Sequence, residues 1–178
     1  MSQSLERYLR VCAGFTSRLS SVGANQWTLP TPCEDWDVAT LVCHVIDMQW
    51  RVGGSIDRKA NSGGDLLDQW REASTFLVEE LKNPQRATAV SSGMFGEQTF
   101  EDLVGTLVCA DALYHTWDLA RATGQSEDLD EEAVRSTLEF LAPLDEAIRR
   151  PGGFAPKITS PPLADLQTRF LNFGGRAP

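Results

Sequence analysis

Apolar residues recur every three or four positions along most of the chain, which is the period of one face of an α-helix. The pattern predicts helices within residues 5–22, 38–52 and 66–82. Segments rich in glycine, proline and asparagine separate them, and Asp35 or Asp37 can cap the second helix at its N-terminus. The first half of the chain is therefore expected to supply three amphipathic helices.

A fourth helix is expected from near Thr99 to Gly124, and a fifth follows Asp130 and extends to Ile148 before Pro151, Gly152 and Gly153 end it. The intervening residues 86–99 are expected to form a loop, because their β-branched piece is too short to build a sheet. The pattern of residues 154–178 predicts an extended segment followed by a short helix. The apolar residues expected to pack this tail on the bundle are Phe154, Leu163, Leu166, Phe170 and Leu171.

Together these elements predict an all-α fold, a four-helix bundle with an additional C-terminal helix and an extended tail. A length of 178 residues suits one domain, 1–178, and 42% hydrophobic residues can form a core without disulfides.

The net charge of -9 opposes binding to nucleic acid or to anionic membrane surfaces, since both carry negative charge. The N-terminal MSQSLERYLR has charges where a signal peptide needs an apolar run. No segment approaches the ~20 apolar residues of a membrane span. A soluble cytoplasmic protein is therefore expected.

The four cysteines do not suggest disulfides or a metal-binding pair of thiols. Cys12, Cys43 and Cys109 each lie within an amphipathic helical pattern, and no C-x-x-C pair occurs, so buried thiols are expected. Cys33 lies in LPTPCEDW, where it is either a small residue at the entry to a helix or an accessible nucleophile or ligand. The acidic residues that follow it would raise the pKa of its thiol and make it a poor nucleophile.

An aspartate and a histidine interrupt the apolar stripe of the fourth helix. An advance of about 100° per residue places Asp111, His115 and Asp118 along the inward-facing side. His44 lies within the inward stripe of the second helix, and the chain has two histidines in all. A buried carboxylate costs several kcal/mol unless it is paired or binds a cation, and no lysine or arginine lies on a clearly inward stripe.

A divalent metal held by His44, Asp111 and His115 would remove this cost. Two imidazoles and one carboxylate suit Zn²⁺ first, with Ni²⁺, Fe²⁺ or Co²⁺ as alternatives, and leave positions for water or substrate. A structural His–Asp pair without metal explains the same spacing. A di-iron centre fits less well, because the repeated E-x-x-H motifs of such bundles are absent.

Four charged residues near the histidines have two interpretations each. Asp47 and Asp118, one turn away, are candidates to accept a hydrogen bond from a metal-binding histidine, or they cap and pair at the surface. Arg51 and Arg121 either bind a substrate carboxylate or form surface salt bridges.

Two segments resemble the signature blocks of a known family. WTLPTPCEDWDVATLVCHVI and DALYHTWDLARATGQ are similar to those of the DinB-like superfamily, in the branch of the metal-binding domain of mycothiol-dependent maleylpyruvate isomerase. The tail from Phe154 resembles that of short, single-domain members of actinobacterial type. The resemblance implies a divalent metal bound by a histidine of the second helix and an acidic-x-x-x-histidine pair of a later one. His44, Asp111 and His115 occupy these places, although the isomerase has glutamate where this chain has Asp111.

The resemblance implies a metal- and thiol-dependent transferase or isomerase, with mycothiol as cosubstrate and a small electrophile as its other partner. The isomerase has a further C-terminal domain that contacts the substrate, and the resemblance does not extend to it. Maleylpyruvate isomerisation itself is therefore not expected. A non-catalytic metal-binding bundle and a metal-dependent hydrolase with the same three ligands are the alternatives. A homodimer is left open.

Overall fold

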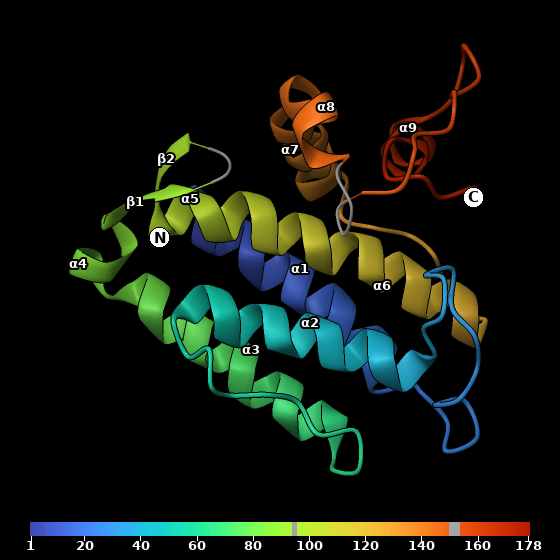
Figure 1. Ribbon diagram of the computed structural model, residues 1–178, viewed down its shortest axis with the longest axis horizontal. Helices are drawn as coiled ribbons and strands as arrows, with labels where there is room; N and C mark the ends of the chain where they lie inside the picture. Colours follow the sequence, from blue (N-terminus) through green and yellow to red (C-terminus); the bar gives the residue numbers. More distant parts are fainter. Residues whose placement is uncertain (94–95, 150–153) are drawn as a thin grey trace.

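Four long helices pack side by side in the computed structural model, which describes residues 1–93, 96–149 and 154–178. They are α1 (Gln3–Leu19), α2 (Val38–Gly53), α3 (Leu66–Lys82) and α6 (Cys109–Thr123). Figure 1 shows α1 behind the other three, with α2 between α3 and α6. The prediction of an all-α, DinB-like bundle is confirmed. No helix in the described ranges is long and apolar enough to cross a lipid bilayer.

Side chains that accept hydrogen bonds from backbone N–H groups fix where these helices begin. Ser2 caps α1 and Asp65 caps α3. Of the two aspartates expected at α2, Asp37 is the cap, and its carboxylate accepts from the N–H of Thr40 at 2.8 Å. Gly54, in the left-handed region at φ 91°, ends α2 as a glycine readily does.

Large apolar side chains fill the space between the helices. Trp70 of α3 is fully buried, and its ring lies 4.7 Å from that of Phe15 on α1. Its Nε1 donates to the hydroxyl of Thr16 at 2.8 Å, so the indole is satisfied as well as packed. This contact joins α1 to α3.

The expected fourth helix is one helical run with a wider turn inside it. It comprises α5 (Phe100–Leu103), the π-helical segment η1 (Val104–Val108) and α6. The side chain of Arg7 on α1 is buried and donates to the carbonyl oxygen of Gly105 in η1 at 3.2 Å. A π turn adds a residue to the turn, so a constant 100° step does not carry from Val104 to Asp111.

Residues 90–99 correct the prediction of a loop. They contain two short antiparallel strands, β1 (Val90–Gly93) and β2 (Gly96–Thr99), in which Val90 pairs with Thr99. The strand length on which the prediction relied applies to strands that build a core, whereas these two strands are largely exposed. A short helix, α4 (Pro84–Ala87), precedes them.

The expected fifth helix is interrupted. It divides into α7 (Glu131–Leu141), a 3₁₀ segment η2 (Ala142–Leu144) and α8 (Asp145–Ile148), because Pro143 cannot donate a helical hydrogen bond. Its expected end at Pro151–Gly153 lies outside the described residues.

The C-terminal tail forms the expected short helix, α9 (Leu166–Phe173), which contacts α7. In Figure 1, α7, α8 and α9 lie above α6, on the side of the bundle opposite α3. Phe170 and Leu171 are fully buried as predicted, and Phe154 and Leu166 are partly buried. Leu163 is 98% exposed, so its predicted packing is wrong. It lies in the turn that precedes α9, where helical spacing does not apply.

Trp70→Ala should lower the free energy of unfolding by ~3–5 kcal/mol, because it removes a fully buried indole and leaves a cavity between α1 and α3. Urea unfolding followed by circular dichroism measures the change. Leu163→Ala is the control and should alter stability by less than ~0.5 kcal/mol. Equal losses for the two variants would contradict this description of the core.

Candidate metal centre

The structure brings together the three side chains predicted to bind metal. His44 lies on α2, and Asp111 and His115 lie one turn apart on α6, which packs against α2. Asp111 Oδ1 lies 3.0 Å from His44 Nε2 and 3.6 Å from His115 Nε2. One donor atom from each of the three residues lies within 4.8 Å of the others. Two imidazole nitrogens and a carboxylate therefore converge on one point between the helices.

Asp111 has one oxygen that the protein does not satisfy. Its Oδ2 is buried and has no hydrogen-bond partner, and the whole side chain is only 11% exposed. A carboxylate in this position lacks compensation for the water it loses, and a bound cation supplies that compensation. The donor set and the unpartnered oxygen both fit a divalent metal ion. The His44 side chain, 29% exposed, keeps one side of the cluster accessible to solvent.

Asp118 lies behind His115, away from this point of convergence. Its side chain is fully buried, and its Oδ2 lies 3.0 Å from His115 Nδ1. Arg176 donates to both of its oxygens, from Nε at 3.1 Å and from Nη2 at 2.7 Å. Burial alone would raise the pKa of Asp118, but hydrogen bonds from His115 and Arg176 outweigh it and lower the pKa to about 2. An ionised carboxylate only accepts, so Nδ1 is the His115 ring nitrogen that donates to Asp118, and Nε2 lies toward Asp111.

Of the two aspartates expected to support a histidine, only Asp118 contacts one. The carboxylate of Asp47 accepts instead from the N–H of Ala60 at 2.7 Å and lies 3.6 Å from Lys59 Nζ. Of its two interpretations, Asp47 therefore has the pairing role, and it ties α2 to the connection before α3. Helical spacing places a residue on a face but does not say which loop covers that face.

The two arginines near the histidines in sequence lie outside the cluster. Arg121 pairs with Glu127 at 2.9 Å and donates to the carbonyl oxygen of Ala177. It therefore has the surface salt-bridging role. Arg51 is exposed at the end of α2.

Two residues of the site were not predicted. Trp36, in the loop before α2, has its ring 4.7 Å from the His44 ring and 5.7 Å from the His115 ring. Backbone hydrogen bonds within residues 31–36 shape this loop, and Asp35 adopts φ 62°, in the left-handed region. Arg176 comes from the tail. The sequence signal that could have identified Trp36 is its place in the same signature block as Cys33. No periodic pattern marks Arg176.

Cys33 also lies at the site, with its Sγ 3.2 Å from Asp118 Oδ2 and 3.8 Å from His115 Nδ1. Burial and the Asp118 charge raise the pKa of its thiol to about 12. The predicted direction is right, but the acidic neighbours in sequence are not its cause. Cys33, His115 and Asp118 form a second group of donor atoms within 4.8 Å, in which the Arg176 guanidinium already neutralises the carboxylate.

The other cysteines are free thiols. Cys12 and Cys109 are buried as expected, whereas Cys43 is half-buried on α2. The expectation of a fully buried Cys43 is therefore wrong, because its position lies beside the inward stripe rather than on it.

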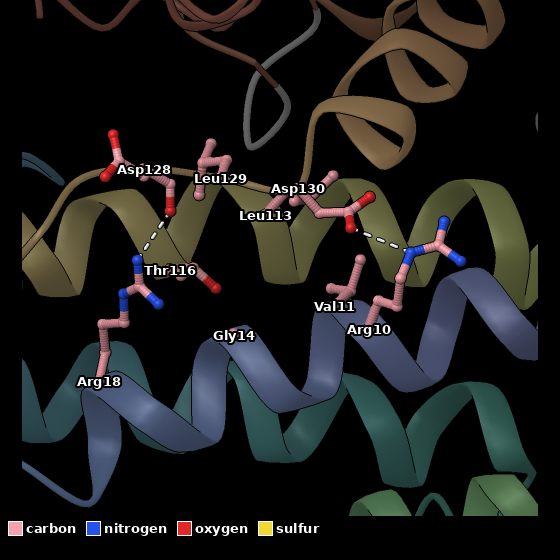
Figure 2. Close-up of a pocket in the computed structure, with 9 residues that line it drawn as sticks. All are labelled: Arg10, Val11, Gly14, Arg18, Leu113, Thr116, Asp128, Leu129 and Asp130. Carbon is pink, nitrogen blue, oxygen red and sulfur yellow. Dashed lines mark hydrogen bonds and ion pairs between the residues drawn. The ribbon is translucent and has the colours of Figure 1, made fainter.

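A pocket of about 80 Å³ lies on the other side of α6, between α1 and the segment 128–130 (Figure 2). Leu113 and Thr116 line it, and they point away from Asp111 because each residue turns the helix by about 100°. The arginines beside it, Arg10 and Arg18, bond to Asp130 and to the carbonyl oxygen of Asp128. The pocket shares no residue with the metal cluster.

Comparison with known proteins gives one family. Residues 8–65 match the family model of the mycothiol maleylpyruvate isomerase N-terminal domain. Two uncharacterized proteins of Mycobacterium tuberculosis, from strains H37Rv and CDC 1551, are each 34% identical over 176 residues, which cover 94% of this chain and 96% of the relative. Rice phospholipase D alpha 2 is 39% identical over 72 residues, but these span only 9% of that protein.

No solved structure matches the chain significantly. The matched family model covers the loop with Cys33 and Trp36 and the helix with His44, and the likeness to the mycobacterial relatives extends along nearly the whole chain. The chain therefore belongs to the family of the mycothiol maleylpyruvate isomerase N-terminal domain, built as a DinB-like helical bundle.

Proposed function

We propose that this protein binds one divalent metal ion, preferably Zn²⁺, through His44, Asp111 and His115. We further propose that it activates mycothiol for transfer to, or isomerisation of, a small electrophile. Two observations support the metal site: the Asp111 carboxylate converges with two imidazoles, and its buried Oδ2 has no hydrogen-bond partner. The choice of mycothiol as the thiol rests on the family whose model matches the chain. A non-catalytic bundle and a hydrolase with the same ligands remain as outcomes of the tests below.

The residues of the site divide the work. A bound divalent ion would hold a thiol in its deprotonated form near neutral pH. Asp111 supplies negative charge to the ion, and the two Nε2 atoms supply neutral donors. Asp118 holds the His115 ring through Nδ1, at 3.0 Å. Trp36 packs against both imidazoles and shields them from water on that side.

The reacting sulfur must come from outside the chain. Burial raises the pKa of the Cys12 thiol to about 12, and it also raises that of Cys109. The pKa of Cys33 is raised to about 12, and burial and nearby aspartates raise that of Cys43. None of these groups offers a useful fraction of thiolate near neutral pH, so a low-molecular-weight thiol is the required nucleophile.

Untagged protein should contain about one divalent ion per chain, as one set of three ligands allows. His115→Ala should bind substoichiometric metal, because two protein ligands hold an ion less tightly than three. Elemental analysis after dialysis measures both. Asp47→Asn is the matched control and should keep full occupancy, since Asp47 bonds to Ala60. Wild-type protein that neither contains metal nor takes it up on titration would refute the metal site.

Asp111→Asn should separate a metal ligand from a structural ion pair. In the presence of a chelator, the variant should lose less than ~1 kcal/mol of unfolding free energy, because it removes a buried charge with an unpartnered oxygen. Breaking a buried ion pair that the fold depends on would cost ~3–5 kcal/mol. With Zn²⁺ at about 100 times its dissociation constant, wild type should gain ~2.7 kcal/mol and the variant much less. Urea unfolding with and without Zn²⁺ supplies the four values.

Protein loaded with Co²⁺ should develop sulfur-to-metal charge-transfer absorption when mycothiol is added. Cys33→Ser should leave this change intact, because the sulfur is exogenous. Alkylation of Cys33 at pH 8 should be on the order of a thousandfold slower than that of a free thiol, since its pKa is about 12. No spectral change at millimolar thiol with cobalt bound would reject the transferase and favour a hydrolytic or non-catalytic role.

A further inference from the structure

The tail beyond α9 brings a cation into the interior. Arg176 is the third residue from the end of the chain, yet its side chain is only 15% exposed. Nε and Nη2 of its guanidinium donate to Asp118, and Nη1 donates to the carbonyl oxygen of Gly174. The group also lies 4.8 Å from the centre of the Tyr114 ring. Planar, two-point pairing of this kind fixes a carboxylate in orientation as well as in charge.

Two glycines make this approach possible. A Cβ on Gly174 would lie 2.2 Å from the Tyr114 ring, so only a residue without a side chain lets the tail pass α6. Gly175 has φ +78°, in the left-handed region, and a Cβ there would lie 2.7 Å from that of Ala155. The N–H of Arg176 then bonds to the carbonyl oxygen of Leu171. The NFGGR sequence thus closes α9 and directs the arginine to Asp118.

Asp118 is the shorter of two links between Arg176 and the metal cluster. The other runs through the Cys33 Sγ, which lies 3.8 Å from Arg176 Nη2 and 3.8 Å from His115 Nδ1. The Oδ2 of Asp118 receives the Nη2 of Arg176 at 2.7 Å and faces His115 Nδ1 at 3.0 Å, and the Cys33 thiol donates to the same atom. Without the guanidinium, the buried carboxylate would lose the two hydrogen bonds that fix its orientation. Its Oδ2 would then no longer be held as the acceptor in front of His115 Nδ1.

We propose that Arg176 is a positioning residue for His115, acting through Asp118 to fix the imidazole with its proton on Nδ1 and with Nε2 free toward Asp111. This proposal rests on the proposed function in that it takes His115 as a metal ligand. It adds the C-terminal tail to the metal centre, although no atom of the tail is among the three proposed ligands.

The tautomer is tested first, on full-length, metal-free protein labelled with ¹⁵N-histidine. The ring nitrogen shifts of His115, assigned by comparison with His44→Gln, should show the Nδ1–H form in wild type. Arg176→Gln should shift His115 toward a mixture of tautomers. The matched control is Arg121→Gln, which removes the neighbouring tail contact to Ala177 but does not touch Asp118, and it should leave the wild-type spectrum.

Metal affinity is the second readout. Competition with a chromophoric chelator should show Zn²⁺ bound ~10–100-fold more weakly by Arg176→Gln, the usual effect of losing a residue that orients a ligand. Arg176→Lys should give an intermediate loss, because it keeps the charge but not the two-point pairing. If Arg176→Gln does not fold, Arg176→Lys provides both comparisons.

The outcomes separate the two proposals. If wild type binds no metal, the proposed function fails while the tautomer spectra still decide the role of Arg176. An unchanged His115 tautomer in the arginine variants, or a loss of affinity as large in Arg121→Gln, would overturn the positioning role.

Discussion

The burial of two carboxylates on one face of α6 is the constraint on which the site depends. Asp111 and Asp118 lie on either side of His115, and each needs positive charge or hydrogen-bond donors that the apolar core does not supply. The protein satisfies Asp118 completely, with Arg176, His115 and Cys33. It leaves one oxygen of Asp111 without a partner. This asymmetry distinguishes a carboxylate that supports the structure from one that is available to a ligand.

The bundle helices and the segments that connect or follow them contribute differently to the site. Contacts of α6 with α1 and α2, and of α2 with α3, hold the backbone under the histidines. The loop before α2 and the tail after α9 then add side chains that no bundle helix supplies, Trp36 beside the imidazoles and Arg176 behind Asp118. A rigid support with variable connections is a common way to build a site, because loops can change without loss of the core.

The cysteines matter to the chemistry because the pKa of each thiol is raised. Burial raises the pKa of Cys12 and Cys109, and burial together with Asp118 raises that of Cys33, which lies nearest the candidate centre. A thiol-dependent reaction at this site would therefore use an external sulfur without competition from the chain. The same arrangement explains why Cys33 can lie beside His115 as a hydrogen-bond donor to Asp118.

The sequence alone determined the helices of the bundle, part of the inward face of each helix and the convergence of His44, Asp111 and His115. Helical periodicity is local, and a family resemblance supplied the pairing of helices. The sequence also indicated that Asp118 lies beside His115, three residues away on the same helix. Only the tertiary structure decided that Arg176 pairs with Asp118 and that Trp36 covers the imidazoles. These contacts join positions 58 residues or more apart, or depend on the path of a loop, and no periodic pattern encodes them. The π turn at η1 depends on what packs around it, so spacing rules gave a regular helix in its place. The short strand pair of β1 and β2 is largely exposed and has no apolar pattern by which spacing could distinguish it from a loop.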